Sequence, residues 1–245
     1  MCGGRVEEPS IILWTLVLVG SLNGLALASS YALVLWPPSR QKIQERSYTL
    51  KTLNQRMPII GLNLVILVGI TVGSLSLFGD FFSWQEQSIW TTTWQVILVS
   101  LVDDAFFYGF HRTLHQNKWL YKKIHLIHHK AYTPVPIEYI YVHPLEWMGG
   151  SIGIVLGLGV LLIITGGHMS AVTFLVYSGL RNFHELDIHS GLKSKWVIRF
   201  LPFVGAAEHH DMHHAKPHSG NYGSTYVFWD HLFGTRAPMQ TEQSK

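Results

Sequence analysis

The chain has 245 residues, of which 48% are hydrophobic and only 13% are charged. Soluble globular domains typically carry about 25% charged residues, and the mean hydropathy here is +0.20, so the composition indicates an integral membrane protein. The single cysteine, Cys2, excludes an intramolecular disulfide as well as thiolate zinc sites and iron–sulfur clusters. The formal charge of +3 comes without a basic tract, so nucleic acid is not an expected partner.

The first apolar run covers residues 11–36. As a helix it would reach about 39 Å, which is enough to cross a bilayer with some tilt. A cleaved signal peptide is the alternative, because residues 26–28 read Ala-Leu-Ala, a small-x-small site. The preceding flank carries Glu7 and Glu8, and the apolar run continues beyond the candidate cleavage site. Both features favour a retained membrane span.

Two further spans are predicted at 58–78 and 90–110. The loop before them, 37–57, is basic, whereas the connection between them, 79–89, contains acidic residues and no basic one. The positive-inside rule then places the basic loop in the cytoplasm and the connection on the far side, so that the third helix brings His111 to the cytoplasmic face. The charged residues of the basic loop are Arg40, Lys42, Glu45, Arg46, Lys51 and Arg56.

The last apolar block, 147–180, is interrupted at 165–168 by Thr-Gly-Gly-His. Two shorter helices joined by a glycine turn fit this pattern best, and they return the chain to the cytoplasmic side near Arg181. The sequence therefore predicts an all-α integral membrane protein with about four transmembrane helices. A cytoplasmic cap rich in histidine would hold a dinuclear metal site.

Most of the 15 histidines fall into spaced groups. Residues three and four apart lie on one face of a helix, so each HxxHH group can present three imidazoles to one point or bridge two nearby metals. Imidazole suits iron, zinc, copper and nickel. Two metals can use about eight to ten nitrogen ligands, which no mononuclear site needs. The groups are an HxxxH pair at His111 and His115, one HxxHH at His125, His128 and His129, and another at His210, His213 and His214.

Acidic residues near these groups are candidates to orient the ligands. Asp104 lies seven residues before His111, two turns down the same helical face, where it could accept the second ring proton of that histidine. An ionisable side chain inside a span is costly and suggests function. Glu208 and Asp211, beside the last histidine group, could play the same part.

The histidine motifs resemble those of the fatty acid hydroxylase/sterol desaturase superfamily. The similar stretches are 104–115, 125–129, His189-Ser-Gly and 210–214, and the tail 220–235 is similar especially to C4-methylsterol oxidases. The resemblance implies a four-helix membrane base and a non-haem site with two Fe ions. It also implies dioxygen as cosubstrate and electrons from NAD(P)H, delivered by a cytochrome b5-type or similar separate carrier.

The resemblance also implies a set of ligands. His184 is only a possible tenth, because four residues separate it from His189, whereas fatty acid 2-hydroxylases have three and sterol oxidases often have only the histidine before Ser-Gly. On this basis residues 1–100 form the N-terminal spans with the basic loop, and residues 101–240 form the catalytic region with the last membrane hairpin. The implied ligands, which are also the catalytic residues, are His111, His115, His125, His128, His129, His189, His210, His213 and His214.

These observations predict a lipid hydroxylase or desaturase that acts on a sterol or fatty-acyl substrate from the bilayer. In a eukaryote it would lie in the endoplasmic reticulum, and in a prokaryote in the inner membrane. The alternative is a histidine-ligated zinc metallohydrolase or a metal-binding transport protein. Hydrolytic zinc sites usually take about three protein ligands, and transporters place polar ligands near the middle of the membrane, so the alternative fits the pattern less well.

Overall fold

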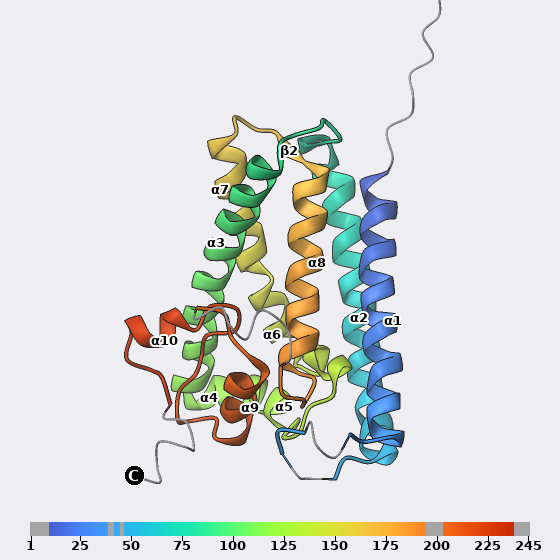
Figure 1. Cartoon of the computed structure of the whole chain (residues 1–245), viewed down its shortest axis with the longest axis vertical. Coiled ribbons are helices and arrows are strands. Elements are labelled where there is room, and N and C mark those ends of the chain that lie inside the picture. Colours follow the sequence, from blue (N-terminus) through green and yellow to red (C-terminus); the bar gives the residue numbers. More distant parts are fainter. Residues whose placement is uncertain (1–9, 39–41, 45–46, 195–202, 238–245) are drawn as a thin grey trace, which may run out of the picture.

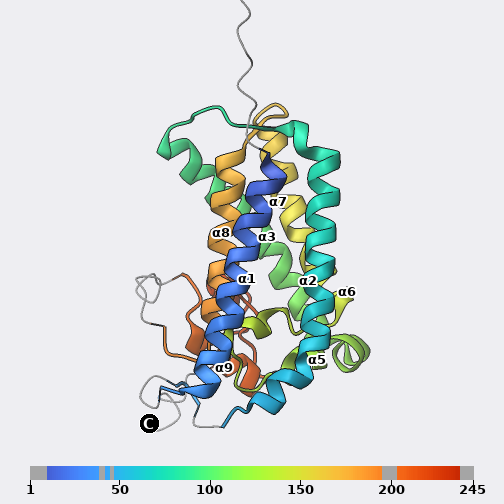
Figure 2. The same ribbon diagram turned by 90° about the vertical axis from the view of Figure 1, so that its right-hand side faces the viewer.

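A computed structural model of the chain describes residues 10–38, 42–44, 47–194 and 203–237. Long helices run side by side along the longest axis, and short helices gather toward one end (Figures 1 and 2). The long helices are α1 (Ile11–Leu35), α2 (Leu50–Phe78), α3 (Ile89–Gln116), α7 (Ile152–Ile164) and α8 (Ala171–Ile188). The short ones are α4 (Lys118–Leu120), α5 (Leu126–His129), α6 (Pro144–Gly150), α9 (Ala207–Ala215) and α10 (Phe228–Leu232), with a π-helical turn at Tyr121–His125 and 3-10 turns at Gly79–Phe81 and Pro136–Ile140.

Among the described residues, three helical segments are long and apolar enough to cross a membrane. Their outward side chains are large and apolar: Val65 is 71% exposed, Leu77 78% and Ile163 82%. Apolar surface of this extent is expected to face lipid rather than water. The all-α membrane architecture predicted from composition is therefore confirmed. The segments are Ile11–Leu35, Leu50–Phe81 and Pro144–Ile164.

Helices α3 and α8 belong to the same bundle but carry charges on their inner faces. Asp103 on α3 accepts a hydrogen bond from Nε of Arg181 on α8, at 2.7 Å. On its other side α3 packs closely on α7, where a Cβ at Gly157 would lie 2.7 Å from the carbonyl oxygen of Val99. Helix α3 continues without a break past the predicted end of its span at residue 110. It therefore carries two histidines beyond the apolar part of the bundle.

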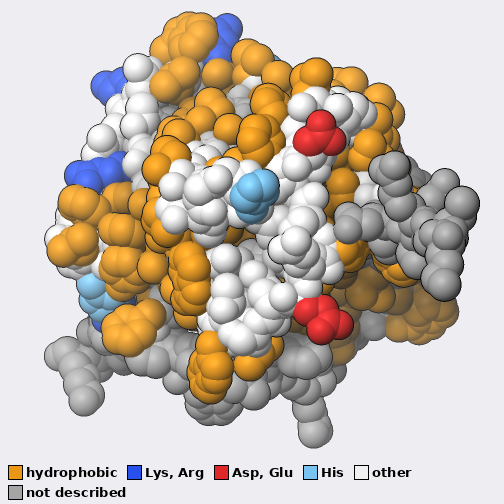
Figure 3. Space-filling model, turned by 90° about the horizontal axis from the view of Figure 1, so that it is seen from above, with side chains coloured by type: hydrophobic (Ala, Val, Ile, Leu, Met, Phe, Trp, Pro, Cys, Tyr) orange, Lys and Arg blue, Asp and Glu red, His pale blue; other side chains and the backbone are white. Residues whose placement is uncertain are grey.

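The predicted glycine turn between the last two long helices is present. Gly166 and Gly167 have φ angles of 70° and 94°, which glycine adopts without steric cost. Strand β2 (Met169–Ser170) follows the turn and pairs in parallel with β1 (Phe82–Ser83), so the two helical connections meet at one end of the molecule. That end shows mainly hydrophobic and uncharged side chains with some acidic ones, and basic side chains only at the margin (Figure 3).

The opposite end of the bundle holds the short helices, and the segment after α5 is anchored between the membrane helices. The Pro136–Ile140 turn packs on α1, α2 and α8. Asn63 of α2 donates to the carbonyl oxygen of Ile140 at 2.9 Å, and Arg56 forms a buried ion pair with Glu138. These contacts fix α5 relative to the bundle. Arg40, Glu45 and Arg46 of the basic loop lie outside the described residues, and the cytoplasmic placement of this end stays a prediction.

Candidate metal centre

Nine histidines from four separate segments come together at the end of the bundle where the short helices lie. They form two groups, and within each group one ring nitrogen of every member lies within 4.8 Å of the others. All nine side chains are buried, none more than 6% exposed. The first group comprises His111, His115, His125, His129 and His213, and the second comprises His128, His189, His210 and His214.

The two HxxHH motifs are divided between the groups in opposite senses. Each motif gives its first and last histidines, which are four residues apart on one helical face, to one group and its middle histidine to the other. Of the two arrangements the spacing allowed, the structure has the one in which each motif bridges both groups. His125 and His129 join the first group and His128 the second, whereas His210 and His214 join the second and His213 the first.

The ring nitrogens inside each group point at one another at short distances. In the first group, Nε2 of His125 lies 2.8 Å from Nε2 of His115, 3.0 Å from that of His129 and 3.2 Å from that of His111. A proton can join only one pair of nitrogens, whereas a metal ion can accept all of these lone pairs at once. The donor set therefore fits a metal. In the second group the Nε2 distances are 3.0 Å for His189–His210, 3.1 Å for His210–His214 and 3.4 Å for His128–His189.

Backbone carbonyls fix which nitrogen of several ligands carries the proton. In three histidines Nδ1 lies 2.8 Å from a carbonyl oxygen. A carbonyl can only accept, so Nδ1 must donate, and the lone pair on Nε2 is left for the metal. The pairs are His111 with Tyr222, His213 with Gly220 and His189 with Glu185.

Burial keeps the imidazoles in the neutral form that binds metals. Desolvation, with a smaller contribution from neighbouring histidines, lowers the pKa of His129 to about 3. The same causes lower the pKa values of His210, His213 and His214 well below 6.5. Metal ligation requires unprotonated imidazole. At neutral pH these side chains are therefore ready to coordinate without releasing a proton.

The two groups adjoin, because the ring centroids of His129 and His214 are only 5.0 Å apart. Nine imidazoles in two adjacent groups match a dinuclear centre and exceed what a single ion can use. Imidazole ligation is compatible with iron, zinc, copper and nickel. The geometry therefore fits the two metal ions that the sequence predicts.

Glu146, in α6, orients a ligand and was missed by the sequence analysis. Its Oε1 accepts a hydrogen bond from Nδ1 of His125 at 2.8 Å, and its side chain is nearly fully buried. A carboxylate in this position fixes the ring and raises the basicity of the ligating nitrogen. The available signal was an acid at the start of an apolar block, which is the same rule that singled out Asp104.

Asp104 is buried, but it does not contact His111 as predicted. The Nδ1 atom of that histidine faces the carbonyl oxygen of Tyr222 instead. The C-terminal segment packs on α3 and places its own backbone against both residues, which the helical spacing could not reveal. Asp104 accepts from the N–H of Thr225 at 2.9 Å, the N–H of Tyr226 at 3.0 Å and Nε1 of Trp229 at 3.0 Å.

Glu208 and Asp211 lie on the same helix as the last histidine group, and their printed contacts are with other segments of the chain. Oε2 of Glu208 accepts from the N–H of Ser194 at 3.3 Å, at the far end of the loop that follows α8. Oδ2 of Asp211 accepts from Nε2 of Gln44 at 2.8 Å, in the connection between α1 and α2. Both carboxylates therefore link α9 to neighbouring segments.

His184 lies outside both groups. Its Nε2 faces the carbonyl oxygen of Ser224 at 3.2 Å. His143 caps α6, with Nδ1 accepting from the N–H of Leu145 at 3.1 Å. Three more histidines that the sequence analysis treated as lone side chains also belong to neither group: His168, His218 and His231.

A cavity lies between the histidine groups and the bundle. Five ligand candidates from both groups line it, so one bound molecule could face both metal positions. Phe107 and Trp147 give it apolar walls, and charged side chains from α6 and α8 add a polar part. The histidines on its lining are His111 and His125 of the first group and His128, His189 and His210 of the second.

Residues 96–235 match the family model described as fatty acid hydroxylase. The chain belongs to the fatty acid hydroxylase family. The match includes all nine clustered histidines and confirms the resemblance that the motifs predicted.

Curated relatives of this fatty acid hydroxylase family member have two kinds of name. A methylsterol monooxygenase of Aspergillus fumigatus is 38% identical over 159 residues, covering 64% of this chain and 53% of the relative. A methylsterol monooxygenase of Arabidopsis thaliana is 36% identical over 156 residues, covering 62% and 54%. A very-long-chain aldehyde decarbonylase of Oryza sativa is 39% identical over 144 residues, covering 58% and 51%. The chain spans about half the length of these relatives, and no solved structure matches it.

Proposed function

We propose that the protein is a membrane-bound lipid oxygenase with two non-haem iron ions, one held by each histidine group. The observation that carries this proposal is the pair of adjoining, buried, all-histidine groups beside a cavity in the membrane bundle. When bound and reduced, two such irons can supply the electrons and binding positions that dioxygen needs to attack an unactivated C–H bond. The reaction would hydroxylate or desaturate the lipid.

The protein's own contribution would be to hold the metals, place the substrate carbon and exclude water. The walls formed by Phe107 and Trp147 suit a hydrocarbon chain or ring system. Gly150 helps to form this space, because a Cβ there would lie 3.3 Å from the Phe107 ring. A lipid would enter sideways from the bilayer between the helices, with its reacting carbon beneath the histidines.

The substrate would carry an oxygen function. The relatives are named for a methylsterol and for a very-long-chain aldehyde, and both compounds contain one. Arg181 lines the cavity, and its side chain is 22% exposed there while Nε is held by Asp103. The remaining guanidinium N–H groups can donate to an oxygen of the lipid, which would orient the substrate relative to the metals.

Electrons would come from NAD(P)H through a separate cytochrome b5-type or similar carrier that docks at the histidine end. This end would face the cytoplasm, in the endoplasmic reticulum of a eukaryote or at the inner membrane of a prokaryote. The acidic connection 79–89 lies at the opposite end of the bundle, which supports this orientation.

The zinc hydrolase and transport alternatives receive less support. Nine clustered imidazoles are about three times the number that a hydrolytic zinc site usually takes. The groups also lie at the end of the bundle, whereas a transport site is expected near its middle.

Lipid profiling of cells with and without the full-length protein tests the proposal. Cells expressing it should accumulate a hydroxylated or desaturated lipid, whereas those expressing His128→Ala or His213→Ala should not. His168→Ala is the matched control, because that exposed histidine lies in the turn at the far end and should leave the product unchanged. A lipid profile that does not respond to the two ligand variants would contradict the proposal.

A further inference from the structure

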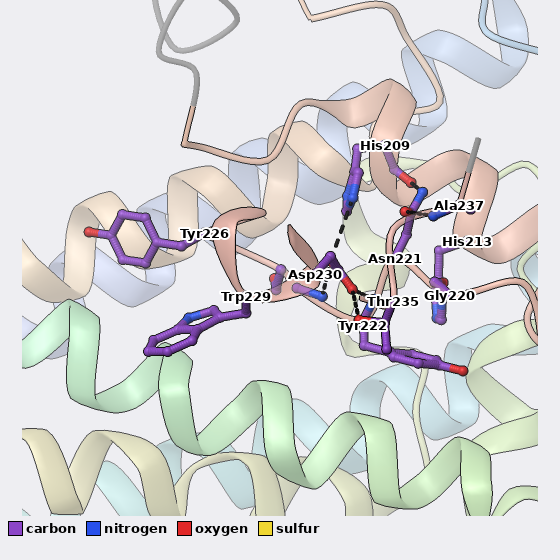
Figure 4. Close-up of polar contacts among 12 residues, drawn as sticks. His209, His213, Gly220, Asn221, Tyr222, Tyr226, Trp229, Asp230, Thr235 and Ala237 are labelled. Carbon is purple, nitrogen blue, oxygen red and sulfur yellow. Dashed lines mark hydrogen bonds and ion pairs between the residues drawn. The ribbon is translucent and has the colours of Figure 1, made fainter. Parts of the chain in front are cut away.

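The C-terminal segment, residues 220–237, is built around one buried carboxylate, that of Asp230 (Figure 4). Its side chain has no exposed surface. Oδ1 accepts hydrogen bonds from the N–H of Tyr222 at 2.8 Å and from Oγ1 of Thr235 at 2.7 Å. Oδ2 accepts from the N–H of Gly223 at 2.8 Å. One side chain thus ties the start of the segment to its end.

The turn held by Asp230 has little freedom to move. Gly220 has a φ of 115° and Asn221 a φ of 60°, both in the left-handed region. A Cβ at Gly220 would collide with the carbonyl oxygen of Thr235. The N–H of Asn221 donates to that same oxygen at 2.8 Å, and its Oδ1 accepts from the N–H of Ala237 at 2.8 Å. The surroundings therefore fix the directions of the carbonyl groups in this turn.

Two of those carbonyl groups hold metal-ligand candidates, and both candidates belong to the first group. Gly220 accepts from Nδ1 of His213, and Tyr222 accepts from Nδ1 of His111. Within the described part of the chain, no direct hydrogen bond joins this segment to a second-group histidine. In that group, Nδ1 of His189 donates to the carbonyl oxygen of Glu185 on its own helix.

We propose that Asp230 is a positioning residue for only one of the two metal positions. By fixing the turn, it aims two carbonyl oxygens at the Nδ1–H groups of His111 and His213, which turns both Nε2 lone pairs toward the first group. The second position does not depend on this turn. The inference rests on the proposed function only in so far as that function requires two metal positions.

The variant Asp230→Asn tests this in the full-length protein purified from membranes. An asparagine keeps one oxygen acceptor but replaces the other with an NH2 group, which would face a backbone N–H and disturb the turn. Changes of this kind around metal ligands typically cost about 10- to 100-fold in metal affinity. We expect bound iron to fall from two per chain toward one. A chromogenic chelator should release one iron about 10- to 100-fold faster, with the other unchanged.

Tyr226→Phe is the matched control. Tyr226 lies in the same segment, and its hydroxyl donates to Oγ of Ser100 at 3.1 Å, away from the turn. This variant should keep both irons with the release rates of the unmodified protein. His210→Ala, which removes a second-group ligand candidate, should weaken the other metal position, so that combining it with Asp230→Asn leaves neither position intact.

Two outcomes would overturn the inference: Asp230→Asn keeping both irons at unchanged release rates, or a folded variant losing both irons equally. If Asp230→Asn fails to fold, Thr235→Val decides, because it removes only the hydroxyl bonds of Thr235 to Asp230 and Tyr108. It should accelerate release of one iron, and equal acceleration of both would reject the inference. If the unmodified protein does not bind two metals, the proposed function fails instead.

Discussion

The two histidine groups draw on the same sequence motif but are stabilised by different parts of the chain. Two members of the first group donate to carbonyls of the C-terminal segment, and a third donates to Glu146 of α6. In the second group, His189 donates to a carbonyl on its own helix. The first metal position therefore depends on contacts between distant segments, whereas the second depends more on local helical geometry.

Replacing Glu146 should have the largest effect that separates the two positions. In Glu146→Ala the Nδ1–H of His125 loses its carboxylate partner, and iron at the first position should bind about 10- to 100-fold more weakly. Iron titration of the purified variant measures this change. Glu146→Gln, which keeps an oxygen acceptor, should retain more of the affinity. Equal weakening at both positions would show that the groups are not independent.

A change in the cavity should affect the lipid rather than either metal. Arg181→Gln removes the charge that we expect to face an oxygen of the substrate, so KM should rise roughly tenfold, since hydrogen bonds to charged groups contribute about 1.5–3 kcal/mol. Iron content should stay at two per chain. Tyr177→Phe is the control, because Tyr177 donates to the same Asp103 oxygen at 2.7 Å but does not line the cavity. If both variants change KM equally, the effect belongs to Asp103.

The smallest effect is expected at His184. Five residues separate it from His189 along α8, which rotates the two side chains about 140° apart on a helix, and it belongs to neither group. His184→Ala should keep both irons and full turnover. It should lower stability by about 1 kcal/mol through loss of the bond to Ser224. Loss of one iron in metal analysis would make His184 a ligand after all.

The sequence predicted those features that depend on local spacing. The apolar runs indicated the membrane helices, and the HxxxH and HxxHH spacing identified the histidines that the structure brings together. The glycine pair at 166–167 marked the turn between the last two long helices. In each case a short stretch of chain contains all the information needed.

Contacts between distant segments could not be predicted in this way. His111 and Tyr222 are 111 positions apart, and no spacing rule connects a ring nitrogen to a backbone carbonyl. For the same reason Asp104 was assigned to the wrong partner. Its helical face was identified correctly, but the segment that packs on that face was unknown. The division of each HxxHH motif between two groups likewise depends on how α5 and α9 approach each other.

The central claim is that two irons lie in separate histidine shells of one chain. Metal analysis combined with iron X-ray absorption, on protein purified from membranes without metal exchange, tests it most directly. We predict two irons per chain, each surrounded mainly by imidazole nitrogen. Zinc alone, or a single iron per fully loaded chain, would contradict the account.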